Sequence, residues 1–457
     1  MKTIYIPNII ILIILLMSSG CKKYLDERPS KNFRTISKLE DAQALLDNYT
    51  SLNQSDIGAG EVSSDDYYLS KENYDQIEEN YRRMYTWEKN YLFVPDFNDW
   101  NNAYKNIYLA NSALELMPKV ERTPENQTQW DNVKGQALFF RAWFLLQAAV
   151  TWAPAYHKPT ANVEPGIPLR LNTNFNEPSV RASLQQTYQQ IADDLREAVT
   201  ILPVKQPALT RPSKEAALAL LARISLYMGS FEEAAIYAND ALKLGDNLLD
   251  FNSLVPSDEY PIKPFNPEVI FESYFYMPVI IANFYAYIKP DLYESYDKND
   301  LRKIIFFKPN GNAYSFYGSY EGNILLFSGI SRNELYLIRA EAYARTNKTA
   351  QAMDDINNLL TNRWKIDPVT RQSLYVSQSA ATSDEALDKI LVERRKELLM
   401  RGLRWIDIKR LNRQGANINM ERVLNGTNLE LKAGDPRFVL PIPEDIIKQT
   451  GIPQNKR

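Results

Sequence analysis

The chain has 457 residues and a formal net charge of −3, with both signs interspersed, which argues against a nucleic-acid partner. Its 45% hydrophobic and 24% charged residues are typical of a soluble globular protein. Because it has one histidine (His157) and one cysteine (Cys21), it lacks the side chains for an intramolecular disulfide or a Cys/His zinc site. We expect no cofactor and no metal site of these types, although the sequence leaves calcium binding open.

The N-terminus predicts export from the cytoplasm. An apolar run from Ile4 to Met17 follows a short positive start and ends in small residues directly before Cys21. The run is too short for a comfortable transmembrane helix but suits a signal peptide over residues 1–20. The sequence resembles a bacterial lipoprotein signal, in which Cys21 is the lipidated first residue and residues 21–38 form a tether. A plain secretory signal is the alternative.

Helical periodicity begins near residue 39 and returns along most of the chain. Apolar residues at three- and four-residue steps predict helices over 39–52, 99–114, 127–152 and 183–202. Trp100 and Trp143 lie on the apolar faces of two of these helices, and Trp405 lies on that of a later one. All three are expected in the core.

The clearest local structure is a helix-turn-helix from Arg211 to Gly245. Gly229 can adopt the left-handed conformation that ends the first arm, and Ser230 with Glu233 predicts a capping box for the second. A second copy follows over residues 335–360, with Asn347 in the place of Gly229. Such tetratricopeptide-like hairpins bury their apolar faces only by stacking, so we predict a mainly α, repeat-built fold.

Two segments rich in tyrosine interrupt the helices, residues 51–97 and 248–329. We expect irregular, partly β structure there, with short strands at 269–271 and 304–307. Aromatic rings beside amide and acidic groups suit sugar binding, since a sugar stacks on the ring and its hydroxyls bond to the polar groups. The predicted ligand-binding residues are Asp65, Asp66, Tyr67, Tyr68, Trp87, Asn90, Tyr91, Tyr314, Tyr317 and Tyr320. The alternative, even for Trp87, is that these side chains anchor their own loops.

A final helix from Ser383, with Thr382 and Glu385 as a capping box, carries a dense charge cluster. Its members are Glu393, Arg394, Glu397, Arg404, Asp407 and Arg410. Paired carboxylates allow a catalytic interpretation, but alternating charges on one helix face favour a structural ion-pair network. Asp300 and Arg302 are expected to brace a loop.

Taken together, these features resemble the SusD/RagB family of outer-membrane nutrient-binding lipoproteins. The similar segments are Cys21–Leu25, Trp100–Asn111, Arg141–Trp143, Gly166–Leu169 with Arg181, Asp193–Leu195 with Ala198, Arg211–Ala235, Asp300–Arg302 and Arg339–Ala342. The most specific are Glu393–Arg394, Glu397–Leu398, Gly402, Arg404, Asp407, Arg410 and Leu440–Pro443. Arg401 departs from the family pattern, in which an acid usually precedes the glycine.

The resemblance implies one SusD-like domain over residues 39–457, with about four tetratricopeptide-like helix pairs and inserted segments that form the ligand-binding face. It implies a lipid anchor in the outer membrane, exposure at the cell surface and a SusC-like TonB-dependent transporter as partner. The stretch from Lys22 to Glu27 is similar to surface-export signals of Bacteroidetes lipoproteins. The implied ligand is a glycan, or a peptide in some members, without catalysis.

Two other functions stay open at this point. A surface glycoside hydrolase that uses carboxylates is the first, because many acids lie near aromatic residues. A lipoprotein scaffold for protein assembly is the second, although it does not need long tyrosine-rich insertions.

Overall fold

The computed structural model describes residues 38–276 and 278–457. The predicted signal peptide and Cys21 lie outside the described residues, so both stay predictions.

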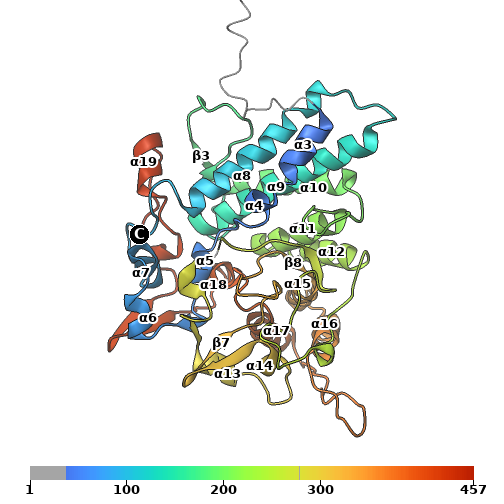
Figure 1. The fold of residues 1–457 in the computed structure, drawn as a ribbon, viewed down its shortest axis with the longest axis vertical. Helices are drawn as coiled ribbons and strands as arrows, with labels where there is room; N and C mark the ends of the chain where they lie inside the picture. Colours follow the sequence, from blue (N-terminus) through green and yellow to red (C-terminus); the bar gives the residue numbers. More distant parts are fainter. Residues whose placement is uncertain (1–37, 277) are drawn as a thin grey trace, which may run out of the picture. The chain divides into compact units, whose positions relative to one another are not determined.

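A succession of packed helices forms the scaffold (Figure 1). It comprises α8 (Asp99–Leu114), α9 (Gln127–Trp152), α10 (Leu184–Ile201), α11 (Lys214–Met228), α12 (Phe231–Leu242), α15 (Arg332–Arg345) and α16 (Thr349–Thr361). Each packs against the next in this order. Trp100 and Trp143 are buried between them, as predicted. The mainly α, tetratricopeptide-like prediction is confirmed.

Both predicted hairpins form, α11 with α12 and α15 with α16. Gly229 has φ 73° and Asn347 has φ 60°, so each supplies the left-handed turn between its two helices. The capping box predicted at Ser230 is wrong, because its side chain makes no cap hydrogen bond. Ser230 has ψ 70°, outside the extended conformation that aims an N-cap hydroxyl at the helix amides.

The first insertion contains more secondary structure than its sequence predicts. The expected helix over 39–52 divides into α3 (Leu39–Leu46) and α4 (Tyr49–Leu52), because the Asn48 side chain accepts a hydrogen bond from the Ser51 amide and restarts the helix. The chain continues through α5 (Ala59–Ser63), β1 (Tyr67–Tyr68), α6 (Lys71–Asp75) and α7 (Glu79–Tyr85).

The second insertion is built from short strands and single turns of helix. The strand predicted at 269–271 forms as β4 (Val269–Phe271), antiparallel to β8 (Ile330–Ser331). The strand predicted at 304–307 is wrong, since α14 (Arg302–Ile305) precedes β6 (Phe307–Asn310). An apolar run of four residues does not distinguish a strand from a buried helical turn. The remaining elements are η2 (Phe251–Ser253), η3 (Val279–Ile281), β5 (Tyr287–Ile288) paired with β1, α13 (Pro290–Glu294) and β7 (Ala313–Phe316) paired with β6.

The C-terminal part returns across the scaffold. It comprises α17 (Ser383–Glu397), α18 (Arg404–Arg413), the hairpin β9 (Met420–Leu424) with β10 (Thr427–Leu431), η4 (Pro436–Phe438) and α19 (Glu444–Thr450). The predicted cap at Thr382 is half formed: Thr382 accepts from the Glu385 amide, whereas the Glu385 carboxylate accepts from Ala381. Outside these runs lie η1 (Met117–Lys119) and β2 (Pro165–Pro168), paired with β3 (Arg181–Ser183).

Arg302 is the centre of a buried ion-pair network. Its guanidinium lies 2.7 Å from Asp300, 2.7 Å from Glu393 and 3.0 Å from Glu397. Arg363 also pairs with Glu397, at 2.7 Å. Although burial raises the pKa of Glu397, the two guanidiniums outweigh it and hold that pKa at about 2. An acid that stays ionised in this way is a poor proton donor for glycoside cleavage.

A second set of buried pairs fixes α18. Arg410 binds Glu341 at 2.6 Å and Asp407 at 2.8 Å, and Arg394 binds Asp407 at 2.8 Å. The prediction of a structural ion-pair network is confirmed. Arg401 joins no ion pair among the described residues; it donates to Ser331 Oγ at 2.7 Å and lies 3.9 Å from the Tyr320 ring centroid.

Candidate functional site

Five of the residues predicted to bind ligand are buried. Asp65, Asp66, Tyr67, Trp87 and Tyr320 each have an exposed fraction of 5% or less. The prediction that these five side chains contact a ligand is therefore corrected, because neither ring face nor carboxylate is open to a ligand in this structure.

Asp65 and Asp66 hold α17 and α18 in place. Arg404 makes two hydrogen bonds to Asp65, at 2.7 and 3.0 Å, and Arg395 binds Asp66 at 2.7 Å. Burial raises the pKa of Asp65, but the facing Arg404 outweighs this and holds that pKa below its usual value. These carboxylates are structural charges.

Trp87 and Tyr67 enclose a buried arginine, Arg422. The guanidinium carbon lies 5.0 Å from the Trp87 ring centroid, 4.9 Å from that of Tyr67 and 3.6 Å from that of Tyr85. Trp87 Nε1 donates to the Ser63 carbonyl at 2.9 Å. Trp87 thus anchors its own loop, the alternative that the sequence left open.

The other predicted residues lie nearer the surface, in separate places. Tyr91 is 63% exposed, Asn90 is exposed, and the Tyr91 amide donates to Glu444 at the start of α19. Tyr68, Tyr314 and Tyr317 are half-buried, each against another tyrosine ring. The tightest of these pairs is Tyr314 stacked on Tyr293, with centroids 3.7 Å apart.

An open pocket of about 400 Å³ lies elsewhere, between α8, the start of the first insertion and residues 274–276 of the second; we name it the α8 pocket. Its volume falls within the range of small-molecule sites. The side chains that line it include the polar groups of Gln54, Asn102, Lys105 and Asn106 and the rings of Tyr274, Phe275 and Tyr276. Tyr276 is 65% exposed, so its ring is accessible for stacking.

Hydrogen bonds fix the floor of the α8 pocket. Asn106 Nδ2 donates to Ser55 Oγ at 2.7 Å, and Ser55 Oγ donates to the Ser51 carbonyl at 2.5 Å. Asn106 is buried, and its Oδ1 atom has no hydrogen-bond partner within the described ranges. This Oδ1 is therefore a buried acceptor without a protein partner, behind the surface of the pocket.

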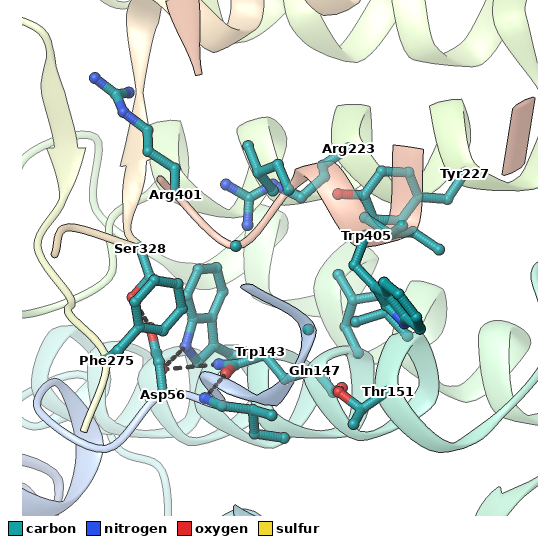
Figure 2. A pocket seen from close by; sticks show the side chains of 17 residues that line it. Asp56, Trp143, Gln147, Thr151, Arg223, Tyr227, Phe275, Ser328, Arg401 and Trp405 are labelled. Atoms are coloured by element: carbon teal, nitrogen blue, oxygen red, sulfur yellow. Dashed lines mark hydrogen bonds between the residues drawn. The ribbon is translucent and has the colours of Figure 1, made fainter. Parts of the chain in front are cut away.

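Asp56 holds the segment that contains Gln54 in place by hydrogen bonds to α9 and to Ser328. Figure 2 shows that its carboxylate accepts hydrogen bonds from Trp143 and Gln147 on α9 and from Ser328, at 2.8, 2.8 and 2.6 Å. The pocket drawn there has a volume of about 60 Å³. It has room for about two waters but not for a sugar ring.

Asn53 joins the two insertions. Its Nδ2 donates to the Glu272 carbonyl at 2.7 Å and to the Thr210 carbonyl at 3.1 Å, and its own carbonyl accepts from the Tyr274 amide at 2.8 Å. The Tyr274 and Tyr276 side of the pocket is therefore held against the Gln54 side without a ligand.

The sequence pattern predicts no site residue among those that line this pocket. A signal was present, since Asn102 and Lys105 lie on the polar face of α8, and Tyr274 and Tyr276 alternate in an extended segment. The sequence does not show that residues near 54 lie beside residues near 275.

Among the described residues, His, Cys, Asp and Glu side chains form no group of three or more that could hold a metal ion. No helix in residues 38–276 or 278–457 is long and apolar enough to cross a membrane.

Comparison with known proteins identifies the family. A family model described as "Starch-binding associating with outer membrane" matches residues 23–226, and the SusD family model matches residues 333–455. A SusD-like protein from Formosa agariphila, P38, is 24% identical over 392 residues, which is 70% of this chain and 73% of that protein.

Solved structures share the fold. A SusD superfamily protein from Bacteroides thetaiotaomicron has a TM-score of 0.75 at 22% identity, covering 92% of this chain and 100% of that one. A SusD-like carbohydrate-binding protein from Bacteroides vulgatus has a TM-score of 0.68 at 19% identity, covering 91% and 97%. A laminarin-binding SusD-like protein has a TM-score of 0.65 at 19% identity, covering 92% and 99%.

The family model that matches residues 23–226 is that of a class of starch-binding proteins associated with the outer membrane. The chain belongs to the SusD family.

Proposed function

We propose that this chain binds a glycan in the α8 pocket and delivers it to a SusC-like TonB-dependent transporter. The main support for glycan binding is the composition of the pocket, in which the exposed Tyr276 ring lines the same wall space as the polar groups of Asn102 and Lys105. A sugar presents a C–H face and several hydroxyls, and the pocket offers a partner for each. Binding, rather than catalysis, fits a charge cluster whose carboxylates are buried in ion pairs.

The proposal includes a mature form anchored at the cell surface through Cys21. Residues 1–20 are then the signal peptide, residues 21–38 the tether and residues 39–457 one domain. Transfer to a transporter is supported by the family resemblance. Co-purification with a SusC-like transporter from detergent-solubilised membranes tests it.

The central experiment measures binding of the purified protein to a glycan and peptide array, followed by isothermal titration. Laminarin is the first ligand to titrate, because a relative of the same fold binds it. Tyr276→Ala and Asn102→Ala should weaken binding about tenfold each, whereas Phe265→Ala, an exposed ring outside the α8 pocket, should have no effect.

Three results would count against the proposal. One is an array without any bound glycan. Another is unchanged affinity in both pocket variants. The third is release of reducing ends during incubation, which would favour a hydrolase. The surface residues of the sequence prediction, Tyr68, Asn90, Tyr91, Tyr314 and Tyr317, remain candidate contacts, and alanine variants of them in the same titration test that role.

A further inference from the structure

A second surface groove lies on the other side of α8. It has a volume of about 540 Å³ and is bounded by α8, by the loop of residues 168–179 and by α19 with Ile452. Figure 1 shows α19 beside the first turns of α8. We name it the α19 groove.

The α19 groove contains an aromatic platform. Tyr108 of α8 and Phe175 of the loop stack with ring centroids 4.9 Å apart and an interplanar angle of 27°. Phe175 is 76% exposed, so most of this apolar ring faces solvent. Its packing against Tyr108 fixes the ring at the groove and leaves surface for a further stacked ring.

The groove also presents polar groups that are not engaged elsewhere. The side chains of Asn101, Lys105 and Gln449 line it, and none has a side-chain hydrogen bond to another part of the described chain. Amide and ammonium groups in this state can bind hydroxyls without first breaking a protein contact.

The loop that carries Phe175 is held in position without ligand. Asn111, which is fully buried, donates to the carbonyls of Arg170 at 2.9 Å and Asn172 at 3.3 Å. Thr173 donates to the Glu115 carboxylate through both its amide and its hydroxyl, each at 2.7 Å. Little ordering of the loop is therefore needed on binding.

The α19 groove and the α8 pocket share one lining residue of α8. Lys105 lines both, and of the adjacent residues Asn101 lines the groove and Asn102 the pocket. The two sites thus lie on either side of one helix. A single sugar cannot occupy both, but a linear chain of linked sugars can cross α8 at Lys105.

We propose that the α19 groove is a second saccharide subsite, which binds an extension of the glycan held in the α8 pocket and so makes the protein select long chains over short ones. The inference rests on the proposed function. Tyr108 and Phe175 supply the stacking surface, and Asn101, Lys105 and Gln449 supply the hydroxyl contacts.

The test compares chain lengths in variants of the groove. The full protein is titrated with laminarin, soluble starch and the other polysaccharides of the array, and with the shortest oligosaccharide of each that binds. Phe175→Ala and Tyr108→Ala should weaken polysaccharide binding roughly tenfold and leave the short oligosaccharide unchanged. Phe175→Tyr keeps the ring face and should bind as the unsubstituted protein does. Phe265→Ala is the control for loss of an exposed ring, and thermal melting confirms that each variant is folded.

Each other outcome has a defined meaning. Unchanged polysaccharide affinity in both groove variants overturns the inference and leaves the proposed function intact. Equal loss for short and long ligands also overturns it, since the groove would then not be a separate subsite. Loss of transporter association with glycan binding preserved identifies a protein-docking surface instead. If no glycan binds the unsubstituted protein, the proposed function and this inference fail together.

Discussion

Trp143 Nε1 donates a hydrogen bond of 2.8 Å to Oδ1 of Asp56, and so ties the centre of α9 to the wall of the α8 pocket. Asp56→Ala would leave the buried donors of Trp143, Gln147 and Ser328 without their acceptor. We expect a loss of about 3 kcal/mol in the free energy of unfolding, measured by urea denaturation. Asp388→Asn changes an exposed acid and should have no effect; equal stability of both variants would contradict this account.

Gly402, in the turn between α17 and α18, lies against the same pocket. It has φ +76°, and a Cβ there would lie 2.6 Å from Cζ of Phe275, which lines the α8 pocket. Gly402→Ala should lower stability by about 2–4 kcal/mol, from backbone strain plus the clash, and should weaken glycan binding by displacing Phe275.

Gly426 is the matched control for Gly402. It has φ +75°, but a Cβ would have no atom within 4 Å. Gly426→Ala should show only the strain, about 1–2 kcal/mol, with unchanged affinity. If the two variants behave alike in denaturation and titration, the contact with Phe275 has no consequence.

Arg302 and its neighbour Lys303 distinguish buried from exposed pairing. Arg302→Met removes the guanidinium that three buried carboxylates share. Arg363 and Lys396 still pair with these carboxylates, but the buried network loses one positive charge, so we expect a loss of about 3–5 kcal/mol. Lys303 pairs with Glu294, whose side chain is 71% exposed, so Lys303→Ala should cost less than about 1 kcal/mol. Differential scanning calorimetry of both variants measures the contrast, and a comparable loss in each would refute it.

Glu61 makes the stability depend on pH. Burial, and then the nearby charge of Asp66, raise the pKa of Glu61 from 4.5 to about 8. Between these values the folded protein keeps a proton that the unfolded chain has released, so the free energy of unfolding should fall as pH rises from about 4.5 to 8. Glu61→Gln mimics the protonated acid and should flatten this fall, whereas Glu232→Gln, at an exposed position, should not. Identical pH profiles for all three proteins would rule Glu61 out as the cause.

The scaffold could be predicted because its rules are local. The spacing of alanines and leucines in α11 and the left-handed residues Gly229 and Asn347 specify two hairpins within short stretches of sequence. Trp100 and Trp143 lie on apolar helix faces, so their burial followed from periodicity alone.

The environment of the site could not be predicted in the same way. From its sequence neighbours, Trp87 is predicted to be an exposed ring for sugar stacking. In the structure, Arg422, which is distant in sequence, packs against that ring. Asp65 likewise looks available until Arg404 is seen to pair with it. Local patterns give no information on such distant partners, and irregular segments have no periodicity from which to infer a buried face.

The contacts of Asn53 determine when the α8 pocket can form during synthesis and folding of the chain. Asn53 links residues near 53, 210 and 272, so the wall of the α8 pocket forms only after the chain has been synthesised well beyond its midpoint and these parts have met. Contacts between residues so distant in sequence form late, because closing the long loops between them is slow. A partly synthesised chain that lacks these residues therefore has no α8 pocket.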